Sequence, residues 1–312
     1  MPKPLLSLLL LMLATTASAD ESRPGIGLAL GSGGAGGLAH IAMLEVFEDL
    51  SIQPNVISGT SIGAIVGALA AAGMESGEIR DLFAEFGDSA LNPFSGLGGG
   101  GVNWTDLIKL DFANGSLIDA EGFLDFVGEH IEARDFADLA IPLKIVATDY
   151  WTGESVVIVE GDLFQAIRAS MAVPGLFAPV HHGDRLLVDG GVSNPLPWTL
   201  LADQDLVVAI DVTGVRTPSP DGPPDLSELL FKTFEIMQQS IIRQQRAAHP
   251  PDIYIKPKLE GIRLLHFDRV DEVVDQARPA ADELRRQLQK ARAETQPRHD
   301  GEAQSEEEPD DE

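Results

Sequence analysis

Short apolar segments alternate with helical patterns along most of this chain of 312 residues. Strands that alternate with helices favour a mostly parallel sheet covered by helices on both faces. We therefore predict one α/β domain over residues 24–292, folded as a three-layer α/β/α sandwich. Strands are expected at 25–30, 55–58, 141–148, 155–159, 185–188 and 205–211, and helices at 38–50, 62–72, 75–86, 120–131, 163–171, 226–247 and 270–292.

The two ends of the chain differ from this body. Residues 1–19 contain Lys3, an apolar run and the triplet Ala17-Ser18-Ala19, which are the three parts of a secretory signal peptide. The apolar run is too short to span about 30 Å of hydrocarbon. We expect export to the periplasm or the medium, with no transmembrane anchor in the mature protein. Residues 293–312 are strongly acidic and are predicted to form a disordered tail.

Composition excludes several classes of function. The net charge is −27, which argues against nucleic acid as a partner because phosphate binding needs clustered Lys and Arg. The chain has no cysteine, so disulfides, zinc–thiolate sites and a thiol nucleophile are excluded. A lipid anchor on cysteine is excluded for the same reason.

Two glycine-rich turns each follow a predicted strand and open a predicted helix. The second turn, Gly59-Thr60-Ser61-Ile62-Gly63, matches the G-x-S-x-G nucleophile elbow. Its glycines allow a sharp turn that lifts the Ser61 hydroxyl to a helix N-terminus, where negative charge is favoured. The alternative is that Thr60 or Ser61 only caps the helix.

The first turn runs from Gly31 to Gly37 and allows three interpretations. It matches the dinucleotide fingerprint G-x-G-x-x-G, but the second strand does not end in the acidic residue that would hold a ribose. A P-loop is excluded because no Lys-Ser or Lys-Thr pair follows the glycines. The remaining interpretation is a nest of backbone N–H groups for an anion. It would form an oxyanion hole for Ser61 if the two strands are neighbours; otherwise the turn only lets a helix pack closely.

A serine nucleophile needs a base, and the sequence offers two kinds. An α/β-hydrolase triad would allow His249 or His266 by chain order, although that fold places its nucleophile after more strands. Asp189-Gly190-Gly191 follows an apolar strand and can aim a carboxylate, but it can also be an ordinary Asp-Gly turn.

Taken together and in order, these motifs resemble the patatin-like phospholipases, with most similarity to the bacterial branch related to neuropathy target esterase. Residues 168–180 also resemble a segment that precedes the aspartate in that family. The resemblance implies a Ser–Asp dyad, with Ser61 as the nucleophile and Asp189 as the proton acceptor. It also assigns residues to the oxyanion hole (Gly33, Gly34 and Ala35) and to the glycine motifs (Gly31, Gly36, Gly37, Gly59, Gly63, Gly190 and Gly191).

The resemblance implies hydrolysis of lipid acyl esters through an acyl-Ser61 intermediate, without metal or cofactor, at a membrane or micelle surface. The family usually has Arg or Lys where this chain has Gly36. With the negative net charge, this departure favours a neutral, zwitterionic or lysophospholipid ester. Two alternatives stay open: a non-catalytic lipid-binding protein on the same fold, and acyl transfer to an acceptor other than water.

Overall fold

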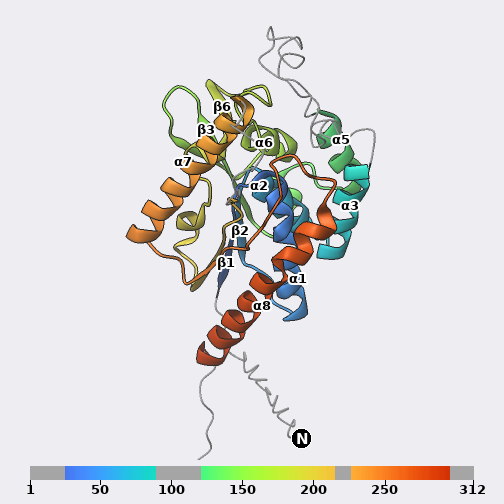
Figure 1. Ribbon diagram of the computed structural model, residues 1–312, viewed down its shortest axis with the longest axis vertical. Helices are drawn as coiled ribbons and strands as arrows, with labels where there is room; N and C mark the ends of the chain where they lie inside the picture. Colours follow the sequence, from blue (N-terminus) through green and yellow to red (C-terminus); the bar gives the residue numbers. More distant parts are fainter. Residues whose placement is uncertain (1–24, 89–120, 215–225, 296–312) are drawn as a thin grey trace, which may run out of the picture.

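A computed structural model of the protein describes residues 25–88, 121–214 and 226–295. Its centre is an eight-stranded sheet in the order β5-β6-β3-β2-β1-β7-β8, with β4 paired to β3 (Figure 1). The four pairs that join β3, β2, β1, β7 and β8 are parallel, whereas β4, β5 and β6 pair in antiparallel fashion. The strands are β1 (Ile26–Leu30), β2 (Val56–Thr60), β3 (Leu143–Asp149), β4 (Ser155–Ile158), β5 (Val180–His182), β6 (Arg185–Asp189), β7 (Leu206–Ile210) and β8 (Ile253–Ile255).

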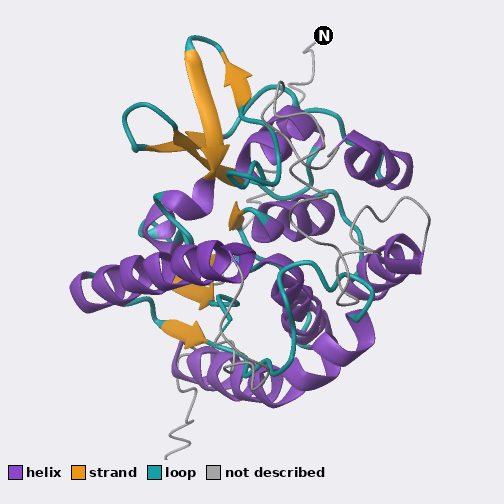
Figure 2. Ribbon diagram, turned by 45° about the horizontal axis from the view of Figure 1, so that its top comes forward, coloured by secondary structure: helices purple, strands orange, loops and turns teal. Residues whose placement is uncertain are grey.

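Helices cover both faces of this sheet (Figure 2). They are α1 (Ala39–Asp49), α2 (Ile62–Ala71), α3 (Ser76–Asp88), α5 (Glu121–His130), α6 (Leu163–Ser170), α7 (Leu226–Ala248) and α8 (Val270–Thr295), with short 3-10 helices η1 (Gly34–Leu38), η3 (Phe136–Asp138), η4 (Gly190–Val192) and η5 (Trp198–Leu201). The predicted α/β/α sandwich is therefore confirmed. Strands β5 and β8 were not predicted. The signal peptide at 1–19 and most of the tail at 293–312 lie outside the described residues.

The two faces of β1 show how the sequence builds the layers. Side chains alternate across a strand, so Leu28 and Leu30 join the large core beneath α1, α2 and α8, while Ala29 joins a smaller cluster on the opposite face. Ile242 of α7 belongs to that smaller cluster. Among the described residues, no helix is both long enough and apolar enough to cross a bilayer.

The register of the sheet places the ends of β2 and β6 in one row. Thr60, the last residue of β2, pairs with Val146 of β3. The neighbouring residue of β3, Ala147, pairs with Asp189 at the end of β6. Because β6 runs against β3, its last residue arrives beside the middle of β3 and close to the turn that follows β2.

Candidate active site

Ser61 sits in a strained turn between β2 and α2. Its φ of 56° and ψ of −121° lie in a region that residues other than glycine rarely adopt. A Cβ on Gly63 would lie 2.1 Å from the Leu30 carbonyl oxygen, and one on Gly59 would lie 2.4 Å from the Gly63 carbonyl oxygen. The turn therefore requires both glycines. The Ser61 side chain makes no capping hydrogen bond, so the geometry is that of an elbow and not of a simple helix cap.

A second serine holds the backbone of this elbow. The Ser61 N–H donates to Ser170 Oγ at 2.8 Å, and the Ser170 hydroxyl donates to the Val146 carbonyl at 2.6 Å. Ser170 is fully buried at the end of α6. Sequence reasoning missed it. It lies within the segment 168–180 that resembles the family, but a serine at a helix end is too common to be singled out by type.

Asp189 is fully buried and carries a shifted pKa. Burial raises the pKa of its carboxyl to about 7, whereas the Ser61 hydroxyl and the Gly191 N–H act in the opposite direction. The Gly191 N–H donates to Oδ1 at 2.6 Å, while Oδ2 has no hydrogen-bond partner among the described residues. The Ser61 hydroxyl is thus close enough to Asp189 to stabilise its carboxylate form, but the two side chains do not form a hydrogen bond. A base with a pKa near neutrality can accept and return a proton.

The first glycine turn lies directly beside the elbow, because β1 and β2 are neighbours and parallel. A Cβ on Gly37 would lie 2.2 Å from the Ile62 side chain. On the other side, the Ser32 hydroxyl accepts a hydrogen bond from Gln238 of α7 at 2.9 Å. A Cβ on Gly191 would lie 3.0 Å from Ser32 Oγ. The first glycine turn therefore adjoins the elbow at Ile62, the turn after Asp189 and α7.

Only some N–H groups of this turn are free to bind an anion. Several are already used: Ala35 donates to the Leu264 carbonyl at 2.8 Å, and Gly36 donates to Gly33 at 3.2 Å. Within the described residues, the N–H groups of Gly33 and Gly34 donate no hydrogen bond. Gly33 and Gly34 are therefore the candidate oxyanion donors with free N–H groups, whereas the N–H of Ala35, also predicted as a donor, is engaged by the Leu264 carbonyl.

None of the histidines considered as a base lies in the row of Asp189 and Ser61. His249 is exposed just after α7, and His266 accepts a hydrogen bond from the Arg263 N–H in the segment before α8. His40 is fully buried, and its Nε2 contacts the Gly31 carbonyl at 2.9 Å. Burial lowers the pKa of His40 to about 4, so the imidazole is neutral and supports the first turn as a donor.

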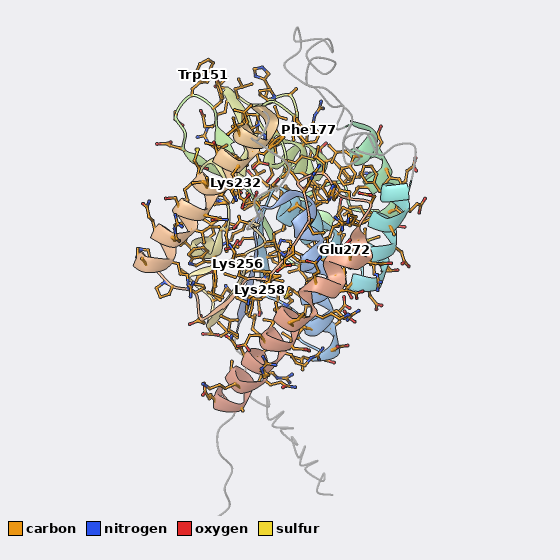
Figure 3. The ribbon with its side chains drawn as sticks, in the orientation of Figure 1. Trp151, Phe177, Lys232, Lys256, Lys258 and Glu272 are labelled. Atoms are coloured by element: carbon orange, nitrogen blue, oxygen red, sulfur yellow. The ribbon has the colours of Figure 1, made fainter. Side chains whose placement is uncertain are left out.

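Gly36 is closely surrounded. A Cβ there would lie 3.3 Å from the Val212 carbonyl oxygen and 3.4 Å from Leu259. The nearby cation Lys256, labelled in Figure 3, forms an ion pair at 2.8 Å with the buried Asp211 next to Val212. The positive charge of Lys256 is therefore neutralised by Asp211 and not by a group in the first glycine turn.

The described residues contain no cluster of three or more His, Asp or Glu side chains that could hold a metal ion. A hollow of about 400 Å³ opens beside β4, where it is lined by residues 156–160 together with His182, Asp184 and Arg185. Neither Ser61 nor Asp189 lines it. The chemistry that the site offers is thus that of a hydroxyl, a buried carboxylate and backbone N–H groups.

Comparison with known proteins identifies a family for this chain. The family model described as patatin-like phospholipase matches residues 28–202, a segment that contains Ser61, Asp189 and both glycine turns. An uncharacterized NTE family protein of Mycobacterium tuberculosis is 36% identical over 212 residues, covering 66% of this chain and 54% of that protein. Patatin-like phospholipase domain-containing protein 7 of Rattus norvegicus is 27% identical over 277 residues, covering 80% of this chain and 20% of that protein.

The chain spans about half the length of the mycobacterial relatives it matches. Among solved structures, VipD from Legionella pneumophila aligns with a TM-score of 0.43 and 14% identity, covering 83% of this chain and 67% of that one. The family match does not depend on this alignment, because the family model covers more than half of the sequence. The chain belongs to the patatin-like phospholipase family.

Proposed function

We propose that this protein hydrolyses acyl esters of lipids, with Ser61 as the nucleophile and Asp189 as the base. One observation carries the proposal: the Asp189 carboxyl is fully buried, has a pKa of about 7 and lies close enough to the Ser61 hydroxyl to be affected by it. Family membership supports the same class of substrate.

In the first half of the proposed reaction, Ser61 Oγ attacks the ester carbonyl carbon while its proton passes to the Asp189 carboxylate. The carbonyl oxygen becomes an oxyanion and accepts hydrogen bonds from the Gly33 and Gly34 N–H groups, a contribution of about 3–4 kcal/mol per donor in comparable sites. When the tetrahedral intermediate collapses, the bond to the alcohol oxygen breaks and that oxygen takes the proton from Asp189. The products are the free alcohol and acyl-Ser61.

In the second half, a water molecule attacks the acyl carbon and gives a proton to the Asp189 carboxylate. Collapse of this intermediate breaks the bond to Ser61 Oγ, which recovers the proton, and the fatty acid leaves. Because the same carboxylate accepts and returns a proton twice, a pKa near neutrality suits both steps better than that of an exposed aspartate.

Charge supports a narrower substrate class. The chain carries −27, and Gly36 adds no cation to the oxyanion turn, where Lys256 is already paired with Asp211. We therefore favour esters with neutral or zwitterionic headgroups over strongly anionic ones. We also propose export through the signal peptide at residues 1–19, which would bring the enzyme to such lipids outside the cytoplasm.

The proposal predicts how the purified protein reacts with a fluorophosphonate probe and a p-nitrophenyl acyl ester. The wild type should be labelled and should turn over the ester, whereas Ser61→Ala should do neither. Asp189→Asn should react at least about 100-fold more slowly, because it removes a general base. His249→Gln, at an exposed position, is the matched control and should behave as the wild type.

Other results would change the assignment. Full activity of Asp189→Asn would rule out the Ser–Asp dyad. A wild type that the probe does not label would indicate a lipid-binding protein without catalysis. Labelling with product formed only when an alcohol acceptor is present would assign acyl transfer instead of hydrolysis.

A further inference from the structure

Large exposed apolar side chains are confined to two segments of the described structure. One is the β3–β4 hairpin at residues 150–159, and the other is residues 229–237 in the first half of α7. Trp151 is 77% exposed. Single exposed apolar residues are normal on a protein surface, but a grouping of this kind marks an interaction surface. We call it the apolar rim; its members are Tyr150, Trp151, Val157, Val159, Leu229, Leu230, Ile236 and Met237.

The tip of the hairpin, at Tyr150 and Trp151, lies above the nucleophile, whereas Val157 pairs with Val146 and is level with Thr60. Strand β3 runs parallel to β2, and Val146 pairs with Thr60, the residue before Ser61. Tyr150 follows Val146 by four residues, so it lies roughly 13 Å beyond the level of Thr60 at the usual rise of a strand. Figure 3 shows Trp151 at this end of the molecule, away from the end towards which α8 runs.

The helical part of the rim reaches a similar height from the other side. Gln238 of α7 contacts Ser32 in the first glycine turn. Leu230 lies eight residues earlier along the helix, which corresponds to about 12 Å. Figure 1 shows α7 beginning near the outer ends of β3 and β6. The outer parts of the two segments, Tyr150–Trp151 and Leu229–Leu230, therefore stand at the same end of the molecule, above the carboxyl ends of β1 and β2.

We propose that the apolar rim docks this protein onto a lipid surface with zwitterionic headgroups, so that Ser61 faces the lipid. This inference rests on the proposed function, because the docked surface would supply its substrate. Tyr150 and Trp151 pack edge to face with ring centroids 4.9 Å apart. Aromatic rings with one polar atom settle at the headgroup level, while Leu, Ile and Met enter the apolar layer beneath.

The charges around the rim select the kind of surface. Arg185 lies 4.0 Å from Asp149, and Lys232 lies 3.1 Å from Glu235, so each rim cation has an acidic neighbour. Figure 3 shows Lys232 on the side of α7. Binding to anionic lipid relies on clusters of basic residues, which this pattern does not provide. The two rim segments and their neighbours carry more acidic residues than basic ones, among them Glu154, Glu160 and Asp184, on a chain of net charge −27. This excess of negative charge disfavours an anionic lipid surface and leaves a zwitterionic one as the better match.

The test uses the Ser61→Ala protein, so that no substrate is consumed, and sucrose-loaded phosphatidylcholine vesicles. This protein should sediment with the vesicles. Adding Trp151→Ser and Leu230→Ser should weaken binding at least tenfold while leaving the melting temperature within about 2 °C, since both side chains are exposed. The matched control Gln289→Ser, exposed on α8, should bind as the parent does.

Tryptophan fluorescence tests the same contact, and a misfolded variant would not give the result expected here. Emission should shift to the blue when vesicles are added, and Trp151→Phe should lose the shift while still sedimenting. Equal binding by the double rim variant would overturn the proposal, as would stronger binding to phosphatidylglycerol vesicles. Loss of a dimer in the rim variant, without vesicle binding by the parent, would assign the rim to a second copy of the chain.

Docking and catalysis can fail separately in these experiments. A parent protein that binds vesicles, together with a wild type that the fluorophosphonate probe does not label, would leave docking standing without the proposed function. A labelled wild type whose Ser61→Ala form does not bind would leave the function standing without docking.

Discussion

Asp189 shows how burial changes the chemistry of one residue. An exposed aspartate is a weak base at neutral pH because its pKa is near 4. In this protein, burial raises the pKa of Asp189 to about 7, and a single Gly191 N–H holds the carboxylate in place. The position of the side chain, and not its type, makes it a suitable partner for Ser61.

The pH dependence of hydrolysis follows from this pKa. In the proposed reaction Asp189 is ionised when it accepts the Ser61 proton, so kcat/KM for a soluble ester should rise with pH around a midpoint near 7 and level off above it. At pH 6 the rate should be about one tenth of the plateau, because one pH step below a pKa leaves about a tenth of the base ionised. A pH-stat assay between pH 5.5 and 8.5 measures this, and a flat profile would contradict the assignment.

For single residues, the sequence points to those that belong to a motif but not to those that act through contacts between distant segments. Ser61 and Asp189 were proposed as site residues because each sits in a glycine motif. Ser170 and Gln238 were missed, since their roles depend on the packing of α6 and α7 against distant turns. Ala35 was assigned with its neighbours, and only the structure shows that its N–H is taken by Leu264, far along the chain.

Among the elements, α2 depends most strictly on its first residues. Gly63 packs directly on the backbone at the end of β1, so the helix and the strand approach more closely than any side chain would allow. This approach keeps the elbow next to the first glycine turn. The distance between the two turns is therefore set by a glycine and not by a hydrogen bond.

Replacement of this glycine should damage both stability and activity. We expect Gly63→Ala to lower the free energy of unfolding by about 3 kcal/mol or more, because its Cβ would lie 2.1 Å from the Leu30 carbonyl oxygen. The matched control is Gly77→Ala in α3, where no atom lies within 4 Å of the added Cβ. It should be neutral or should stabilise the protein by about 1 kcal/mol. Urea denaturation of both variants measures the difference, and equal stabilities would contradict the packing argument.

Element prediction succeeded where the pattern was long and failed where it was short. The predicted helices and six strands are present, because each has several residues of clear period. Strands β5 and β8 have three residues each and were missed for that reason. The order of the strands was not predictable either. The antiparallel placement of β6, which brings Asp189 beside β3, depends on contacts between distant segments.

For the whole molecule, two buried groups make stability depend on pH in opposite directions. Burial lowers the pKa of His40 to about 4, so stability falls as the pH falls from about 6.5 towards 4. Burial raises the pKa of Asp189 to about 7, so stability falls as the pH rises from about 4 to 7. Below pH 6.5 the two effects partly cancel, which flattens the stability curve in mild acid.

Replacing Asp189 should leave a pH dependence of stability in which the effect of His40 is no longer offset. Asp189→Asn abolishes the destabilisation by the buried charge, which is about 4 kcal/mol for a pKa raised by about three units. At pH 8 its melting temperature should therefore exceed that of the wild type by about 10 °C, given about 2–4 °C per kcal/mol for a domain of this size. The difference should disappear near pH 4, where Asp189 is protonated. His249→Gln should follow the wild-type curve. A difference that stays constant from pH 4 to 8 would show that the carboxyl does not titrate as stated.

The position of β1 in the sheet has a consequence for where this domain can be divided. The family model ends at residue 202, yet β1 pairs on one side with β7 and, through it, with β8, both of which follow that point. The first glycine turn also relies on the Leu264 carbonyl and on Gln238. A chain ending at residue 202 would therefore leave the middle of the sheet as an open edge, prone to pairing with other chains. The segment that identifies the family is thus shorter than the unit that can fold.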